Sequence, residues 1–371
     1  MEPKNRLNQD QTHLNETIAR VRRRPSKLKD THVTLAHGAG GKASAALVEH
    51  VFFNAYGNDL LGQAGDSAVI GLNELVNAGD APGAQIAFSS DGYVVNPIEF
   101  PGGNIGELAI NGTVNDLAVA GAIPQFISAS FILEEGLEIE TLRRIVASMH
   151  QAADKAGVCI AAGDTKVVPK GACDKIYITT SGIGIIPQAR TLGFEHVEKG
   201  NKIIVSGPIA DHGMAVMMAR GDLAITAPIE SDTREVATLV DALVAAVPNT
   251  RWMRDATRGG LATVMNELAE NTGLGVALED EAIPVRPMTR AACDMLGIDP
   301  LYVANEGTFC AVVPAEDAER AVAALGAAGA ENPQVIGRMV SQPAAAVVLI
   351  TGFGGTRMVD KLVGDPLPRI C

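Results

Sequence analysis

Hydrophobic positions in the first half of the chain follow two different spacings from about Leu35 onward. Short runs rich in Val, Ile and Phe, bounded by glycines and polar residues, are typical of β-strands, and apolar residues three and four positions apart are typical of helices. The predicted strands are 85–88, 92–95, 127–133, 158–161 and 175–186, and the predicted helices are 104–120, with Asn104 as a cap, and 138–156. Strand 158–161 is wholly apolar, so we expect it to be buried. The pattern predicts a mixed sheet with helices over it.

A polar stretch with glycines interrupts this pattern between Pro187 and Gly200, and the alternation then starts again. In the second half the predicted strands are 202–206, 276–278, 309–313, 335–340 and, last, 344–350, and the predicted helices are 233–246, 260–271, 288–296 and 315–325. Because such interruptions mark domain boundaries, we predict a first domain at 31–187 and a second at 188–345. A final strand and a mobile tail are expected at 346–371.

The composition fits two domains. A chain of 371 residues exceeds the length of roughly 250–300 residues at which single cores stop growing. Of the residues, 47% are hydrophobic, but only nine are Phe, four Tyr and one Trp, so Ala, Val, Ile and Leu must build the cores. Disordered and collagen-like chains are excluded by this composition. The predicted fold class is α/β (α+β), with a mixed sheet and helices in each domain.

The net charge of −13 bears on the class of ligand. It argues against a general nucleic-acid binder, because affinity for a phosphate backbone needs a basic face. It does not exclude nucleotides, since backbone N–H groups and magnesium can hold a small anion in an acidic protein.

Residues 1–30 have the opposite balance, with eight Lys or Arg against four acids. This basic extension is either a flexible, solvated segment or a docking arm. It contains no apolar signal-peptide core, and no run of 18 apolar residues follows it. We therefore expect an intracellular, cytoplasmic protein that has no membrane partner.

The five cysteines are an odd number and include no Cys-X-X-Cys pair, so neither a disulfide framework nor a structural zinc site is predicted. Cys159 and Cys310 lie in apolar runs and are predicted core residues. Cys371 is the last residue and follows the proline-containing segment 366–370. It is either an ordinary exposed terminus or an accessible thiol that acts as a nucleophile or carries an acyl group.

A glycine-rich segment precedes the first helical pattern. Its residues are His37, Gly38, Ala39, Gly40, Gly41 and Lys42. Glycines let backbone N–H groups approach a phosphate, and the start of a helix favours an anion. The segment departs from the P-loop pattern at Ala36 and Ala43. A phosphate-binding loop closed by Lys42 and a structural turn are therefore both open.

Four aspartates lie in polar, glycine-punctuated settings in the first half, namely Asp66, Asp91, Asp116 and Asp164. Each alone could be a turn or cap residue. Asp91 and Asp164 follow apolar strands, where ligand sites of sheet proteins gather, and an unpaired Asp116 inside an apolar helix would be costly. Together the four predict a site for a hard cation, with magnesium and nucleotide phosphates neutralising the cluster.

Two further residues could take part in chemistry. Lys166 follows Asp164 by two positions and lies either near the reacting phosphoryl group or on the surface as an ordinary lysine. Glu306, between Asn305 and Gly307, lies in a turn between strands and is either a catalytic carboxylate or an exposed turn acid.

Several of these segments, in this order, carry a resemblance to a known family. They are 37–42, 90–92, 100–106, 112–117, 163–168, 254–260, 305–307 and the terminal Pro368-Arg369-Ile370-Cys371. From about residue 31 to the end, the chain resembles the hydrogenase maturation family HypE, and the terminal motif is highly specific. This family comprises carbamoyl dehydratases of the aminoimidazole-ribonucleotide-synthetase-like ATP-using superfamily. The resemblance does not extend to the basic extension.

The resemblance implies a two-domain aminoimidazole-ribonucleotide-synthetase-like fold with a flexible C-terminal tail. It implies a homodimer whose first-domain sheets join, with ATP near the dimer cleft. The implied partners are the carbamoyltransferase HypF, which loads Cys371, and the HypC–HypD scaffold, which accepts cyanide for the iron of a [NiFe]-hydrogenase centre. The implied ATP contacts are His37, Gly38, Gly40, Gly41, Lys42, Asp91, Gly92, Asn115, Asp116, Gly163, Asp164 and Thr165, and the implied magnesium ligands are Asp66, Asp91, Asp116 and Asp164.

The implied reaction converts a thiocarbamate on Cys371 into a thiocyanate. ATP would phosphorylate the amide oxygen so that phosphate departs while two N–H protons are removed, and Lys166 and Glu306 are predicted to polarise the carbonyl and take protons. The alternatives are a thiamin-phosphate kinase or selenophosphate synthetase of the same superfamily, or a non-catalytic nucleotide-binding assembly scaffold. A terminal Pro-Arg-Ile-Cys has no use in those two enzymes, and no cysteine precedes Cys159.

Overall fold

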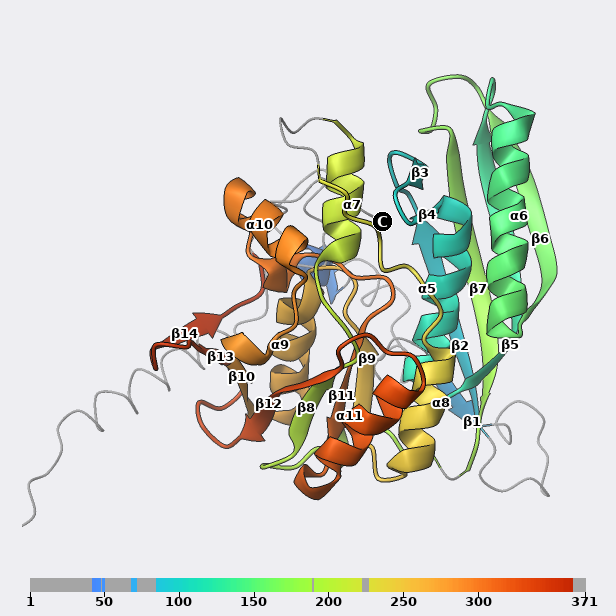
Figure 1. Cartoon of the computed structure of the whole chain (residues 1–371). Helices are drawn as coiled ribbons and strands as arrows, with labels where there is room; N and C mark the ends of the chain where they lie inside the picture. The colour runs from blue at the N-terminus through green and yellow to red at the C-terminus, as the bar shows by residue number, and fades with distance from the viewer. Residues whose placement is uncertain are drawn as a thin grey trace, which may run out of the picture.

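The computed structural model describes residues 42–47, 49–50, 68–71, 85–188, 190–221 and 227–362. These residues form two halves, each built on one main sheet (Figure 1). The first sheet has the strand order β1-β2-β7-β5-β6, and the second has the order β14-β13-β10-β12-β8-β11-β9. One parallel pair in each sheet, β5–β6 and β10–β13, lies among antiparallel pairs. The predicted α/β class, with a mixed sheet and helices in each half, is confirmed. The basic extension 1–30 and the tail 363–371 lie outside the described residues.

The first half places helices on one face of its sheet. Its elements are α2 (Lys42–Leu47), β1 (Ala68–Gly71), β2 (Gln85–Tyr93), the hairpin β3 (Glu99–Phe100) and β4 (Gly103–Asn104), α5 (Ile105–Val119), β5 (Ile123–Glu134), α6 (Ile139–Ala156), β6 (Cys159–Val168) and β7 (Ile176–Ile186). The predicted strands 85–88 and 92–95 are one strand, because residues 89–91 continue the pairing with β7. Strand β7 comes last in the sequence of this half but pairs with both β2 and β5.

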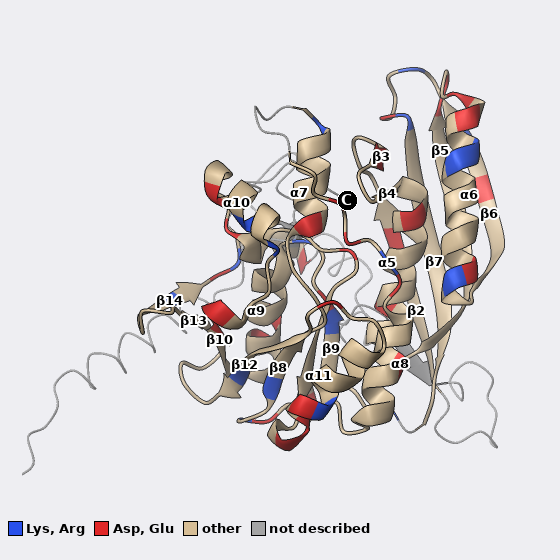
Figure 2. Ribbon diagram, in the orientation of Figure 1, with Lys and Arg blue, Asp and Glu red and all other residues tan. Residues whose placement is uncertain are grey.

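Helix α5 lies between the first sheet and the second half (Figure 1). It begins as predicted, because the Asn104 side chain accepts hydrogen bonds from the N–H groups of Gly106 (2.8 Å) and Glu107 (3.2 Å). Almost all of its residues are buried, since it packs on the sheet, on α6 and on the second half. By contrast, α6 is amphipathic, and Figure 2 shows Lys and Arg interspersed with Asp and Glu along it.

Strand β6 differs from the prediction. It extends to Val168 instead of ending at 161, and its residues are exposed instead of buried. Cys159, predicted to be a core residue, is exposed for the same reason. The cause is that β6 lies at the edge of the sheet as far as the structure describes it, with β5 as its one neighbour among the described strands. Cys310, on β11, is buried as predicted.

The sheet face opposite α5 and α6 carries exposed apolar side chains. Phe88, Ile183 and Phe126 occupy one row across β2, β7 and β5, and Ile185 and Ile123 form the next row. All five are exposed, and Phe126 has the largest exposed fraction at 53%. We name this surface, defined by these five residues, the open face.

The second half surrounds the seven-stranded sheet with helices. Its strands are β8 (Lys202–Val205), β9 (Trp252–Asp255), β10 (Gly275–Glu279), β11 (Phe309–Val313), β12 (Gln334–Val340), β13 (Val347–Ile350) and β14 (Thr356–Val359). Its helices are α7 (Asp211–Ala219), α8 (Ala237–Ala246), α9 (Gly260–Thr272), α10 (Pro287–Leu296) and α11 (Ala318–Ala327), and its short 3-10 turns are η4 (Phe194–His196), η5 (Asp280–Ala282), η6 (Pro300–Tyr302) and η7 (Ala315–Asp317).

Most of these elements match the predicted spacing, with three differences. Helix α7 and strand β9 were not predicted, because α7 is buried on almost all sides and so lacks an amphipathic spacing, and β9 is only four residues long. The strand predicted at 344–350 is not the last one. The chain turns at 351–355 and returns as β14, which pairs with β13 through all four of its residues.

No helix among the described ranges is long and apolar enough to cross a membrane.

Helices α5 and α6 pack so closely at Gly106 that a larger residue should destabilise the protein. A Cβ at this position would lie 2.4 Å from the carbonyl oxygen of Ile145 and 2.8 Å from its Cγ2 atom. We expect Gly106→Ala to lower the free energy of unfolding by about 1–3 kcal/mol, because the two helices must separate. Gly326→Ala on α11 is the control, since its Cβ would meet only the Pro333 ring at 4.0 Å. Urea denaturation measures both, and equal stability of the two variants would contradict the packing.

Candidate active site

A cavity of about 250 Å³ lies where the two halves meet. The first half lines it with Ser90, Asp91, Tyr93, Gly112 and Asp116, and the second half with Arg254, Asp255, Thr257, Arg258, Thr263, Val264, Glu267 and Glu306. These residues come from β2 and α5 on one side and from β9, α9 and the turn before β11 on the other. The cavity therefore exists only because the halves pack together.

Carboxylates dominate this cavity. Glu306 is 4% exposed, and its burial, followed by the negative charges of Asp255, Asp232 and Asp91, raises the pKa of its carboxyl well above the ordinary value. The nearby Arg258 guanidinium acts in the opposite direction on this pKa but does not cancel the effect. Glu306 thus retains its proton at a pH at which an exposed glutamate has lost it. The predicted alternative of an exposed turn acid is wrong.

Two arginines partly offset the negative charge. Arg258 Nη2 lies 3.4 Å from Asp91 Oδ1 and so links the second half to β2. Arg254 Nη1 lies 2.9 Å from Glu267 Oε2 within the second half. Five acids, namely Asp91, Asp116, Asp255, Glu267 and Glu306, line the cavity against these two arginines, so the cavity favours a ligand that brings positive charge or a bound cation.

Tyr93 adds a buried hydroxyl to the wall. Burial and the charges of Asp91 and Asp116 raise its pKa well above the usual value, so the Tyr93 hydroxyl keeps its proton. Its hydroxyl lies 3.5 Å from Thr113 Oγ1. A Cβ on Gly112 would lie 2.2 Å from the Tyr93 hydroxyl oxygen, so only glycine leaves room for it.

The backbone around Glu306 is held from both halves. The N–H groups of Glu306 and Gly307 donate to the two carboxylate oxygens of Asp232 at 2.9 and 3.0 Å. The Glu306 carbonyl accepts a hydrogen bond from Asn115 Nδ2 of α5 at 3.2 Å. These bonds fix the turn that presents the Glu306 side chain to the cavity.

Asn115 is buried and uses its whole amide to join the halves. Besides Glu306, its Nδ2 donates to the carbonyl of Arg234 at 3.0 Å, and its Oδ1 accepts from the N–H of Val236 at 2.8 Å. These bonds use the carbonyl of Arg234 and the N–H of Val236 outside a helix, and α8 begins at Ala237 and not at the predicted position 233. In the described structure, both N–H groups of the Asn115 amide are occupied by backbone carbonyls. The implied ATP contact of Asn115 stays a prediction.

Asp164 lies far from the other predicted aspartates. The strand register runs from Asp91 through Thr180 and Ala129 to Gly163, one residue on each of β2, β7, β5 and β6. Because side chains alternate between faces, Asp164 points to the opposite face of the sheet from Asp91. Three strand spacings separate their backbones by about 14 Å. Within one copy, Asp91 and Asp164 therefore cannot bind the same ion.

Asp164 and Lys166 instead form an exposed ion pair on β6, with a distance of 2.7 Å between Lys166 Nζ and Asp164 Oδ2. Hydrogen bonds from Lys166 and from the Thr165 N–H lower the pKa of Asp164. Gly163 lets β6 approach β5, since a Cβ there would lie 2.4 Å from the carbonyl oxygen of Ala129. Gly92, on β2, has no such close neighbour.

The remaining predicted residues divide into two groups. Lys42 begins α2, where its Nζ lies 3.6 Å from Asp360 Oδ2. Outside the described residues lie His37, Gly38, Gly40, Gly41, Asp66 and Cys371.

The residues present suit magnesium. Within the described ranges, no three His, Cys, Asp or Glu side chains converge closely enough to hold a metal ion by themselves. Asp91 and Asp116 nevertheless line one cavity, and Ser89 Oγ donates to Asp116 Oδ2 at 2.6 Å. Magnesium usually takes one or two carboxylates, several waters and the phosphates of a substrate. Two carboxylates beside a nucleotide therefore fit this ion.

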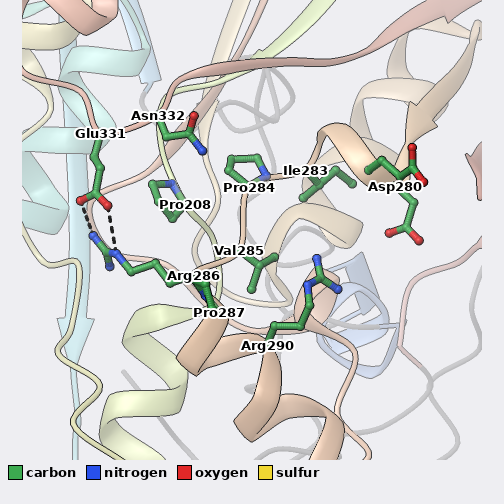
Figure 3. Close-up of a pocket in the computed structure, with 11 residues that line it drawn as sticks. Pro208, Asp280, Ile283, Pro284, Val285, Arg286, Pro287, Arg290, Glu331 and Asn332 are labelled. Atoms are coloured by element: carbon green, nitrogen blue, oxygen red, sulfur yellow. Dashed lines mark hydrogen bonds and ion pairs between the residues drawn. The ribbon is translucent and has the colours of Figure 1, made fainter. Parts of the chain in front are cut away.

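A second, larger cavity of about 660 Å³ lies in the second half near the start of α10 (Figure 3). Its wall includes three prolines and Arg286, whose guanidinium bonds both carboxylate oxygens of Glu331 at 3.2 and 2.6 Å and also pairs with the buried Asp211. This network ties α10 to α7 and uses the charge of Arg286. None of the predicted site residues lines this cavity, so the smaller one is the candidate active site.

The family of the chain follows from comparison with known proteins. Residues 64–186 match the model of the AIR synthase related protein, N-terminal domain, and residues 198–350 match that of the C-terminal domain. The carbamoyl dehydratase HypE of Rhodobacter capsulatus is 49% identical over 348 residues, which cover 93% of this chain and 99% of that protein. The chain belongs to the HypE family. The predicted resemblance is thereby confirmed, and the protein is an enzyme of the carbamoyl dehydratase class.

Two solved structures support the HypE fold. A crystal structure of a HypE–HypF complex has a TM-score of 0.78 and 39% identity, covering 85% of this chain and 100% of that chain. A crystal structure of HypE in complex with ATP has a TM-score of 0.73 and 41% identity, covering 92% of this chain and 100% of that chain. These relatives favour the HypE activity over the alternatives of a kinase, a selenophosphate synthetase or a scaffold.

Several cavity residues were not singled out from the sequence. Tyr93 and Glu267 carry no local motif. Neither does Asp232, which is not part of the cavity wall but holds the backbone of Glu306 and Gly307. Asp255 and Arg258 lie in the segment 254–260, which contributed to the HypE resemblance, but neither was assigned a role. The available signal was the pair of arginines at the start of a helix, which indicates a charged site without showing which residues face it.

Burial of Glu306 makes the stability of the protein depend on pH. Its pKa in the folded state is raised above the ordinary value, so the contribution of the protonated Glu306 carboxyl to stability is fully present below about pH 4.5 and is lost as the pH rises through the folded-state pKa. We expect Glu306→Gln to gain in Tm relative to the parent protein as the pH rises from about 5 to about 8. Glu316→Gln, which removes an exposed carboxyl outside the cavity, is the control. A Tm difference for Glu306→Gln that is the same at every pH would contradict this account.

Proposed function

We propose that this protein uses ATP to dehydrate a carbamoyl group, carried as a thiocarbamate on Cys371, to a thiocyanate. The thiocyanate would supply the cyanide ligand of the iron in a [NiFe]-hydrogenase centre. The observation that carries the proposal is the convergence of Asp91 and Asp116 from one half with the buried Glu306 from the other. It is supported by full-length similarity to carbamoyl dehydratase HypE.

The reaction requires loss of one oxygen and two hydrogens from the S-carbamoyl group. An amide oxygen is a poor leaving group, so ATP phosphorylates it and becomes ADP. The C–O bond then breaks, phosphate departs with that oxygen, and the nitrogen gives up two protons as the carbon–nitrogen triple bond forms. The enzyme must therefore bind ATP next to the thiocarbamate and provide groups that accept protons.

Glu306 is suited to proton transfer. A carboxyl with a raised pKa is a stronger base, once ionised, than an ordinary carboxylate, and its place in a cavity shared with Asp91 positions it near a bound substrate. We assign Glu306 the removal of a proton from nitrogen. Lys166 is assigned to polarising the carbonyl or accepting the other proton.

ATP is the expected phosphoryl donor, because a HypE relative has been crystallised with it. Asp91 and Asp116 would hold magnesium, and Arg254 and Arg258 lie beside them to interact with phosphate oxygens. Bound magnesium would offset the charge of the transferring phosphoryl group. The glycine-rich segment 37–42 and Asp66 are assigned to the same nucleotide.

A homodimer resolves the separation of Asp91 and Asp164. The open face exposes Phe88, Phe126 and Ile183, and large exposed apolar patches mark association surfaces. If the open faces of two copies pack together about a two-fold axis parallel to the strands, the edge strand β6 of one copy lies beside the β1–β2 edge of the other. Asp164 and Lys166 from one copy would then lie at this edge and reach around it to the cavity on the other side of the partner sheet, which contains Asp91.

The proposed partners act on the tail. HypF is expected to load Cys371, since a HypE relative forms a complex with HypF, and the HypC–HypD scaffold is expected to accept the cyanide. All four described cysteines are free, which fits a reducing compartment such as the cytoplasm.

The role of Cys371 can be tested by intact-mass analysis. We expect the protein, incubated with HypF, carbamoyl phosphate and ATP, to gain a carbamoyl adduct and then lose water on the C-terminal peptide. Cys371→Ala should form neither adduct and still bind ATP, because the thiol is not part of the nucleotide site. Cys159→Ala is the control, since Cys159 is another exposed thiol. An adduct on any other cysteine would sink the assignment.

Sharing of the site between two copies can be tested by complementation. Asp91→Asn and Lys166→Ala should each reduce dehydration by at least about 100-fold, because each damages both sites of a dimer. In an equal mixture of the two variants, reassembled from unfolded chains, half of the dimers contain one intact site, so about a quarter of the parent activity should return. A mixture as inactive as its parts shows that Asp91 and Lys166 do not act across the interface.

A further inference from the structure

The last described residues, at the end of β14 and just after it, are bonded to one side of helix α9. The carbonyl of Val359, at the end of β14, accepts a hydrogen bond from Asn266 Nδ2 at 3.2 Å. Two residues later, Lys361 Nζ lies 2.7 Å from Glu270 Oε2. Asn266 and Glu270 are four positions apart and therefore lie on the same side of the helix. Asn266 is buried, and only 15% of the Lys361 side chain is exposed.

Further contacts hold the same short segment. Arg357 Nη2 lies 2.5 Å from Asp299 Oδ2, and the N–H of Lys42 donates to the carbonyl of Leu362 at 3.4 Å. We name residues 357–362 the anchor. It is fixed by contacts to α2, to α9 and to Asp299 next to η6, so its position relative to α9 is defined.

Helix α9 also forms a wall of the candidate active site. Thr263, Val264 and Glu267 line the cavity, and Glu267 directly follows the anchor contact Asn266. Successive helical residues are about 100° apart around an axis, and a helix with its side chains is about 10–12 Å wide. The anchor and the cavity therefore lie on neighbouring sides of one helix. Nine residues follow Leu362, and an extended segment of that length spans about 30 Å, which is enough to bring Cys371 around α9.

We propose that Asn266 and Glu270 are positioning residues that fix the point from which the tail leaves, and thereby set how often Cys371 meets the cavity. This inference rests on the proposed function of Cys371 as the carrier. A tethered group has an effective concentration that falls with about the −3/2 power of tether length. Loss of the anchor lengthens the tether from nine residues to as many as the 21 that follow Ile350. The intramolecular step should then slow about two- to fourfold.

Charge reversal provides the test. Glu270→Lys and Lys361→Glu each replace the ion pair with a repulsion, and the double variant restores an ion pair with the charges exchanged. Glu319→Lys, an exposed acid on α11, is the matched control for reversing one charge. Each protein is first loaded by the carbamoyl-donor enzyme with carbamoyl phosphate, and conversion of its C-terminal peptide to the dehydrated form is then followed by mass spectrometry in a single turnover.

We expect each single variant to dehydrate about two- to fourfold more slowly than the parent protein, and the double variant to recover. Loading of Cys371 and the KM for ATP should not change, because neither depends on where the tail departs. A double variant as slow as the singles would overturn the inference, and so would loading that slows in parallel with dehydration. If the parent protein loads but never dehydrates, the proposed function fails instead.

Discussion

One buried amide, that of Asn115, joins the two halves at the candidate site. It bonds two carbonyls and one N–H from segments that lie about 120 and 190 positions later in the chain. Each of these backbone groups would cost about 1–3 kcal/mol if left buried without a partner, so the halves cannot slide apart without a penalty. Because Glu306 is one of the residues bonded, the same amide helps to set the distance between the Glu306 carboxyl and the aspartates on the other wall. The cavity depends on this contact more than on any local motif.

The negative charges gathered in the cavity lower the stability of the folded protein. Asp91, Asp116, Asp255 and Glu306 are brought together although like charges repel, and the raised pKa of Glu306 is the visible effect. Two arginines reduce the repulsion without removing it. Residues held in such unfavourable surroundings often belong to functional sites, where the ligand supplies the missing interaction. The excess of acids that gives the chain its charge of −13 thus has a local counterpart in the cavity between the halves.

The sequence contained the local parts of this structure but not their assembly. The start of α5 was predictable because its cap, Asn104, adjoins the helix that it stabilises. The exposure of β6 was not, since an apolar run does not reveal whether another element covers it. Asp91, Asp116 and Glu306 were each recognisable as polar residues in unusual settings. Asp232 was not, because it bonds the N–H of Glu306, 74 positions away, and no sequence motif surrounds it. The separation of Asp91 from Asp164 required the strand order, which no single strand encodes.

The place of β7 in its sheet has a consequence for biosynthesis. This strand lies between β2 and β5 and is the last of the five to be translated. Of the described strands, β2 has only β1 as a native partner until residues 176–186 have left the ribosome, and the pair of β5 and β6 remains a separate unit. Non-local pairings of this kind form slowly, and the strand edges stay unpaired and exposed until they have formed. The first half therefore completes its sheet in a single late step, and a nascent chain that stalls before position 176 presents two unfinished sheet edges at once.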